Sequence, residues 1–115
     1  MKIALLSTPT RTSLPNSAPP LGIMYLAPCL LKKGHIVKII DIAKTRQSNK
    51  TTIAELNDFL PDLIGISGII TAYKFIHMLV HDLKPAFPQI PIVIGGHITL
   101  DNTELSLQVF LQLPD

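Results

Sequence analysis

Small polar residues and glycines gather where the apolar segments of this sequence end, and their types could form a ligand site. The candidates are the ends of a proline-rich loop, Thr8, Pro9 and Pro20, then Ser67, Gly68 and Thr71, and finally Gly95, Gly96, His97 and Thr99. Glycine has no Cβ, so a backbone there can lie close to a ligand, and backbone N–H groups can bind it. The pattern is typical of a site for a bulky, flat or phosphate-bearing ligand.

The same positions exclude several common reaction chemistries. No acidic residue precedes Asp41, so the acid cluster of a response-regulator receiver is absent. The sequence has no GxxxxGK[ST] phosphate loop, and its glycines do not form GxGxxG after the first apolar segment. GISG at 65–68 has the wrong spacing for the GxSxG of serine hydrolases. None of these classes is therefore predicted.

The order of apolar segments predicts the elements that position these candidates. Continuous apolar runs indicate buried strands at 2–7, 35–42, 63–67 and within 91–99. Helical periodicity and capping signals indicate helices that run over 19–34, from 51 or 52 to 60, over 71–87, and from 101 or 102 to about 112. Such alternation gives parallel strands joined by right-handed crossovers. We therefore predict an α/β three-layer, flavodoxin-like parallel sheet in the order 2-1-3-4.

In an open sheet of this kind, ligands bind beyond the carboxyl ends of the strands, where the candidate residues all fall. The helices are expected to bury one apolar stripe each. For the first helix this stripe is Ile23, Leu26, Ala27, Leu30 and Leu31. Further residues expected in the core are Met24, Cys29, Leu60 and Met78, with Tyr25 and Tyr73 as core residues that keep a wet hydroxyl. His77 and His81 have a metal-ligand spacing, but without a third ligand a solvated helix face is favoured.

Length and composition indicate one globular domain. The chain has 115 residues, of which 47% are hydrophobic, and the single cysteine cannot form an internal disulfide. No apolar run could span a membrane or act as a signal peptide, which predicts a cytoplasmic protein without membrane contact. Residues 1–50 carry eight Lys or Arg and one acid, whereas residues 51–115 carry two and seven. The basic half favours an anionic ligand or an acidic neighbour, and nucleic acid is not predicted as a partner.

Three segments carry a family resemblance. They are PPLGIMYLAPCLLKKGHIVKIIDI at 19–42, PDLIGISGIIT at 61–71 and PIVIGGHIT at 91–99. The chain resembles, over nearly its whole length, the cobalamin-binding domain that precedes the radical S-adenosylmethionine domain. That arrangement occurs in many methyltransferases and in the anaerobic cyclase of bacteriochlorophyll synthesis.

The resemblance implies a site for cobalamin. The residues it implicates in a groove for the nucleotide tail of the cofactor are Ser67, Gly68, Thr71, Gly95, Gly96 and Thr99, and Thr8, Pro9, Pro20, Gly22 and His97 complete the candidate set. The wider cobalamin pattern D-x-H-x-x-G is missing, because residues 7–34 contain no histidine and no acid. This implies a cobalamin without a histidine ligand from the first loop, and no residue is assigned as a metal ligand.

The resemblance also implies a longer parent enzyme. S-adenosylmethionine and an iron–sulfur cluster would be held by a missing C-terminal domain, so residues 1–115 alone are expected to be inactive. A fifth strand is missing from the predicted sheet, and residues 92–94 would form an exposed edge that pairs with another chain or is locally disordered. Two alternatives remain open at this point. One is a domain that binds a flavin or nucleotide, and the other is an interaction module without a ligand.

Overall fold

A computed structural model describes residues 1–9, 21–68 and 73–95 of the chain. The elements are β1 (Lys2–Ser7), α1 (Leu21–Lys32), β2 (Ile36–Asp41), α2 (Ile42–Thr45), α3 (Asn49–Phe59), β3 (Leu63–Ser67), α4 (Tyr73–Ala86) and β4 (Ile92–Gly95). The strands of these ranges form one parallel sheet in the order β2-β1-β3-β4. The predicted flavodoxin-like α/β fold and strand order are therefore confirmed.

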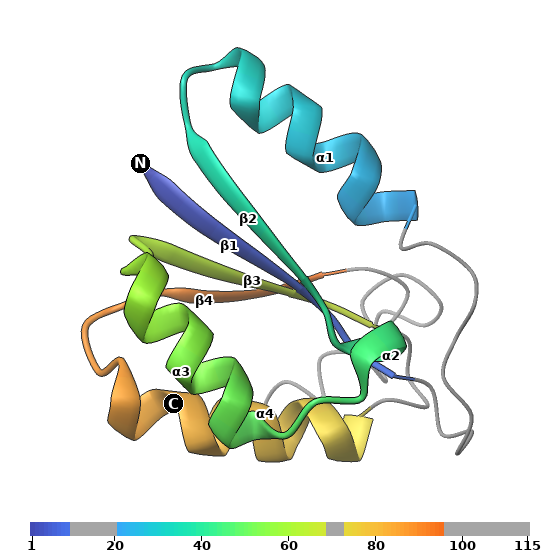
Figure 1. Ribbon diagram of the computed structural model, residues 1–115, viewed down its shortest axis with the longest axis vertical. Helices are drawn as coiled ribbons and strands as arrows, with labels where there is room; N and C mark the ends of the chain where they lie inside the picture. Colours follow the sequence, from blue (N-terminus) through green and yellow to red (C-terminus); the bar gives the residue numbers. More distant parts are fainter. Residues whose placement is uncertain (10–20, 69–72, 96–115) are drawn as a thin grey trace, which may run out of the picture.

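Helices cover the two faces of this sheet unequally. Figure 1 shows α1 on one side and α3 with α4 on the other. On the α3 and α4 side, Leu56, Leu79 and Leu83 pack with the strand residues Ile64 and Ile66 in the larger core cluster. The cluster beneath α1 is smaller, and its fully buried members are Ile3, Leu5, Ile23 and Ala27. Most of the core therefore lies on one face.

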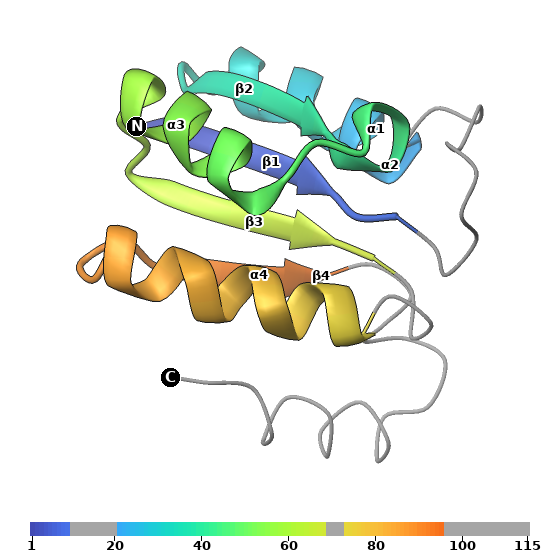
Figure 2. The ribbon, with the colours of Figure 1, turned by 60° about the horizontal axis from the view of Figure 1, so that its bottom comes forward.

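The strands explain this division because their side chains alternate between the faces. In β1, Ala4 and Leu6 point into the larger cluster, whereas Ile3 and Leu5 point toward α1. All four strands run in the same direction, so their carboxyl ends meet at one edge (Figure 2). The fold therefore brings the ends of β1, β3 and β4 together, as the sequence predicts.

The capping of α3 differs from the prediction. Ser48, rather than Thr51 or Thr52, is the N-cap, and its hydroxyl accepts a 3.1 Å hydrogen bond from the backbone N–H of Thr51. At the other end, Leu60 takes the left-handed conformation as the C-cap, and 67% of its surface is exposed. The helix ends one residue too early for Leu60 to join its buried face. The prediction of Leu60 as a core residue is therefore wrong.

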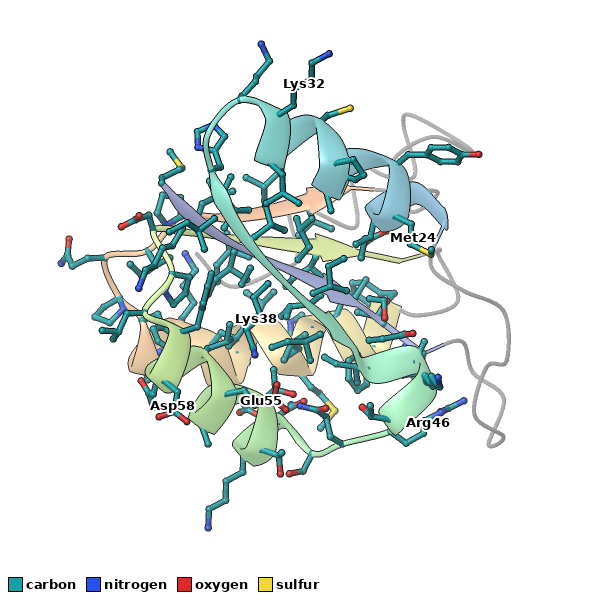
Figure 3. All side chains as sticks on the ribbon, turned by 45° about the horizontal axis from the view of Figure 1, so that its top comes forward. Met24, Lys32, Lys38, Arg46, Glu55 and Asp58 are labelled. Carbon is teal, nitrogen blue, oxygen red and sulfur yellow. The ribbon has the colours of Figure 1, made fainter. Side chains whose placement is uncertain are left out.

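Several apolar residues of α1 also lie outside the core. Leu26 and Leu31 are exposed, as are Met24 and Cys29, and Tyr25 is 75% exposed. Met78 on α4 is exposed in the same way. A single helix on a sheet buries only one stripe, and α1 carries apolar residues almost all round. Figure 3 shows Met24 and Lys32 at the outer surface of this helix.

Three smaller observations complete the fold. The short helix α2 occupies part of the segment after β2 that was predicted as a polar connection. No helix among the described residues is long and apolar enough to cross a membrane. The predicted helix after residue 100 and most of the proline-rich loop lie outside the described ranges.

Candidate functional site

A row of small side chains crosses the carboxyl edge of the sheet on the face that α1 covers. Leu5 packs on this face, so Ser7, two residues further along β1, lies on it as well. The strand register pairs Ser7 with Asp41 and with Ser67, and it pairs Ser67 with Gly95. Two of the predicted candidates, Ser67 and Gly95, are therefore neighbours across β3 and β4.

A groove begins at this row and runs between α1 and the strands β1, β3 and β4. Its lining residues are Leu5, Ile23, Leu26, Gly65, Ile66, Ser67, Val93 and Gly95. The cavity volume is about 230 Å³. Because α1 lies over the smaller cluster of the sheet, the strands β3 and β4 remain open to the groove along one side. Among the residues that the structure describes, the site is thus a cleft between α1 and the sheet.

Gly65 lies in the middle of β3 and forms part of the groove. A Cβ built at Gly65 would lie 3.0 Å from the Cδ2 atom of Leu5, which is closer than ordinary van der Waals contact. At Gly95, a Cβ would meet no atom within 4 Å among the described residues. Gly65 therefore lets the Leu5 side chain pack closely against β3, and a larger side chain there would collide with Leu5 at the groove, whereas the space at Gly95 is open among the described residues.

Ser67 supplies a hydroxyl group at the open end of the groove. The backbone carbonyl of Ser67 accepts hydrogen bonds from the N–H of Thr8 at 3.1 Å and from the Thr8 hydroxyl at 2.9 Å. The Ser67 hydroxyl itself makes no hydrogen bond to any residue that the structure describes. Ser67 is half-buried at the end of β3, where its hydroxyl lies at the groove.

The other described candidates hold the strand ends together. Thr8 and Pro9 are buried, and the Thr8 hydroxyl already bonds to β3. The backbone N–H of Gly68 donates a 3.3 Å hydrogen bond to the Gly95 carbonyl and so ties β3 to β4. Gly22 lies in the first turn of α1. These contacts give Thr8 and Gly68 a structural role beside the groove, and their contact with a ligand stays a prediction.

One polar pair in the row was not singled out from the sequence. The Ser7 hydroxyl donates a 2.6 Å hydrogen bond to Oδ1 of Asp41 and accepts a longer one, at 3.4 Å, from the N–H of Ala43. These bonds join the ends of β1 and β2 and the start of α2. A signal for the pair existed, because both residues end strands that were predicted to be neighbours.

The remaining site predictions fall outside the described ranges. These residues are Pro20, Thr71, Gly96, His97 and Thr99. Conversely, the groove includes five apolar residues that were not predicted as site residues, namely Leu5, Ile23, Leu26, Ile66 and Val93. The alternation of side chains around Gly65 could have identified Leu5 and Val93, since both are its register partners on the same face.

The histidine pair of α4 lies away from this groove, on the opposite face of the sheet. His77 and His81 border a separate cavity of about 280 Å³ together with Met78 and Asp82. Asp82 accepts a 2.8 Å hydrogen bond from the side-chain amide of Asn49. Among the residues with described positions, no three His, Cys, Asp or Glu side chains are arranged to hold a metal ion.

The basic residues do not line the groove either. Lys38 points toward Glu55 on α3, with 4.0 Å between the charged atoms (Figure 3), and Lys2 donates to the Phe59 carbonyl. The described lining residues carry no charge. The groove therefore suits an uncharged, flat group with a hydrogen-bonding atom near Ser67.

These features define an α/β ligand-binding domain with its groove at the carboxyl ends of parallel strands. Comparison with known families supplies the particular class. The B12 binding domain family matches residues 8–111, so the chain belongs to this family. No curated protein sequence gave a match. The chain is thus a cobalamin-binding module, and the flavin or nucleotide alternative is not favoured.

Proposed function

We propose that the nucleotide tail of cobalamin lies in the groove between α1 and the sheet. The observation that carries this proposal is the apolar groove between α1 and the sheet, in which Gly65 and Gly95 bring no side chain and a Cβ at Gly95 would meet no described atom within 4 Å. The other walls fit such a group, since Ile23 and Leu26 offer apolar surface from α1 and Ser67 offers a hydroxyl that bonds to none of the described residues. A planar base in this cleft would be held by apolar contact on its faces and by one hydrogen bond at its edge.

Each lining residue has a distinct part in the proposal. Leu5 and Ile23 provide the floor and the helix wall, and Gly65 and Gly95 let the ligand approach the backbone. Ser67 binds a nitrogen of the base. Contact of Pro20, Gly22, Thr71, Gly96, His97 and Thr99 with the ligand stays a prediction from the sequence.

We also propose that the chain is the cofactor module of a radical S-adenosylmethionine enzyme. The support is the combination of PPLG-x-x-YLA at 19–27 with IGG-H-x-T at 94–99. A bound cobalamin supplies a cobalt atom that can take up and release a methyl group. Residues 7–34 contain no histidine, so this loop offers cobalt no imidazole. Methyl transfer or cyclase-type chemistry would require a further domain that holds the iron–sulfur cluster.

A retention experiment tests the cofactor proposal. The purified chain is mixed with hydroxocobalamin and dialysed, while the corrinoid absorbance is followed and circular dichroism confirms that the protein is folded. We expect the chain to retain the corrinoid, and we expect the Gly65→Val variant to lose most of it. A folded chain that retains no corrinoid would contradict the proposed function.

A second experiment tests the parent enzyme. The longer protein, purified without oxygen, is expected to show iron–sulfur absorbance and to form 5′-deoxyadenosine from S-adenosylmethionine. Residues 1–115 alone should form none. A longer protein without an iron–sulfur cluster would contradict this part of the proposal but leave the cobalamin site standing.

A further inference from the structure

Polarity changes along the groove from its open end to its interior. At the open end lie Ser67 and Gly95, which are register partners. Two residues further into the sheet, on the same face, the register row is Leu5, Gly65 and Val93. This inner row carries only hydrocarbon or no side chain. A ligand in the groove therefore meets a hydroxyl at one end and an apolar surface at the other.

The backbone of the inner row offers no replacement for the missing polar side chains. Gly65 lies in β3, which pairs with β1 on one side and β4 on the other, so its N–H and carbonyl are used within the sheet. From the helix side, Ile23 and Leu26 add apolar surface. Among the lining residues that the structure describes, Ser67 is the one that brings a polar side chain.

We infer that this groove discriminates between corrinoids by the polarity of their base, and that Val93 is a specificity-determining residue. The inference rests on the proposed function. Dimethylbenzimidazole, the base of cobalamin, carries two methyl groups on its six-membered ring, whereas adenine carries two ring nitrogens and an amino group there. With an imidazole nitrogen at Ser67, the six-membered ring lies against the row of Leu5, Gly65 and Val93. Methyl groups fit this row, but the polar atoms of adenine would lose water without gaining a partner.

The expected difference in affinity between the two corrinoids follows from the free energy that is lost when a polar group is buried without a hydrogen bond. Leaving a polar group buried without a hydrogen bond weakens binding by about tenfold or more, even where the site is partly open. We therefore expect the chain to bind cobalamin about tenfold more tightly than the adenine-containing corrinoid.

Val93 allows this inference to be tested without disturbing the core. It is 53% exposed, lies on β4 and borders the groove. Val93→Thr keeps the branched shape and adds one hydroxyl beside the inner row. Ile39→Thr is the matched control, because Ile39 is also part-exposed on the same face of the sheet, but on β2 and outside the groove lining.

The experiment measures equilibrium dissociation constants of the chain for hydroxocobalamin and for its adenine-containing counterpart. The reported quantity is the ratio of the two constants in wild type, Val93→Thr and Ile39→Thr. Comparing ratios cancels the difference in how strongly each base binds cobalt. We expect Val93→Thr to lower the preference for cobalamin at least about threefold and Ile39→Thr to leave it unchanged.

Each outcome has a distinct meaning. A wild-type preference that falls in Val93→Thr alone supports the inference. If Val93→Thr leaves the ratio unchanged, or if both variants shift it alike, the inference is overturned while the proposed cobalamin site stands. If the folded wild-type chain binds neither corrinoid, the proposed function fails and the inference fails with it.

Discussion

The two faces of the sheet perform different tasks. The face under α3 and α4 is packed with large apolar side chains, among them Leu79, Leu83 and Ile64, which have no exposed surface. The face under α1 has a smaller buried cluster and a groove whose central position is Gly65. One face therefore stabilises the fold, and the other has a groove between α1 and the sheet in the part of the chain that the structure describes. Substitutions on the first should change stability, and substitutions on the second should change binding.

The largest effect on stability is expected from Leu79→Ala, in the middle of the packed face. Leu79 is fully buried between α4 and the sheet, and removal of its side chain should lower the free energy of unfolding by about 2–5 kcal/mol. Urea unfolding followed by circular dichroism measures this. Leu26→Ala on the groove wall is the control, and it should cost much less because Leu26 is 47% exposed. Equal losses would mean that the two faces are not divided as described.

The largest effect on binding is expected from Gly65→Val. The new side chain would collide with Leu5 at the groove and should weaken cobalamin binding at least about fivefold, since overpacking of this kind costs about 1–3 kcal/mol. Val37→Ile on the same face is the control, because Val37 packs against the smaller cluster outside the groove lining. Titration with hydroxocobalamin measures both variants. Unchanged binding in Gly65→Val would place the base elsewhere.

Ser7 and Ser67 lie in one register row, but we expect one to contribute to stability and the other to ligand binding. The Ser67 hydroxyl makes no bond within the described residues, so Ser67→Ala should leave stability unchanged and weaken cobalamin binding about threefold to tenfold. Ser7→Ala should do the reverse, with a loss of about 1 kcal/mol of stability, because the Ser7 hydroxyl bonds to Asp41. Urea unfolding and corrinoid titration are applied to both. A stability loss in Ser67→Ala would assign its hydroxyl a structural role.

The smallest expected effect concerns the edge of the sheet. Within the described residues, β4 pairs only with β3, so the other side of Ile92–Gly95 has unpaired backbone groups. The sequence predicts that this edge pairs with another chain or is locally disordered, and we propose the first, that β4 pairs with a second chain. Sedimentation velocity over a range of concentrations should show weak self-association. A monomer at every concentration, with β4 amides protected from hydrogen exchange, would contradict this.

Most of the fold could be predicted from the sequence, because apolar runs and capping residues mark strands and helices locally. The segment 63–67 has the apolar run of a buried strand, and its bounds match β3. The N-cap of α3 was less accessible, since Ser48, Thr51 and Thr52 are all suitable and only the backbone conformation selects Ser48.

The candidate site was accessible only in part. Ser67 and Gly95 were found because they end strands, and their register confirms that they are neighbours. Leu26 was assigned to the core because helical periodicity does not show which strands lie under a helix. Leu26 is exposed and Val93 lines the groove because, among the described elements, α1 does not cover β3 and β4 completely. This arrangement is a tertiary feature that helical periodicity does not show.

The central claim is that the groove holds the nucleotide tail of cobalamin. The most direct test compares the dissociation constants of the chain for hydroxocobalamin and for cobinamide, which has the same corrin ring and cobalt but no nucleotide tail. We predict that cobalamin binds at least about tenfold more tightly than cobinamide, and that Gly65→Val removes the difference. Equal affinity of the wild-type chain for the two corrinoids would contradict the account.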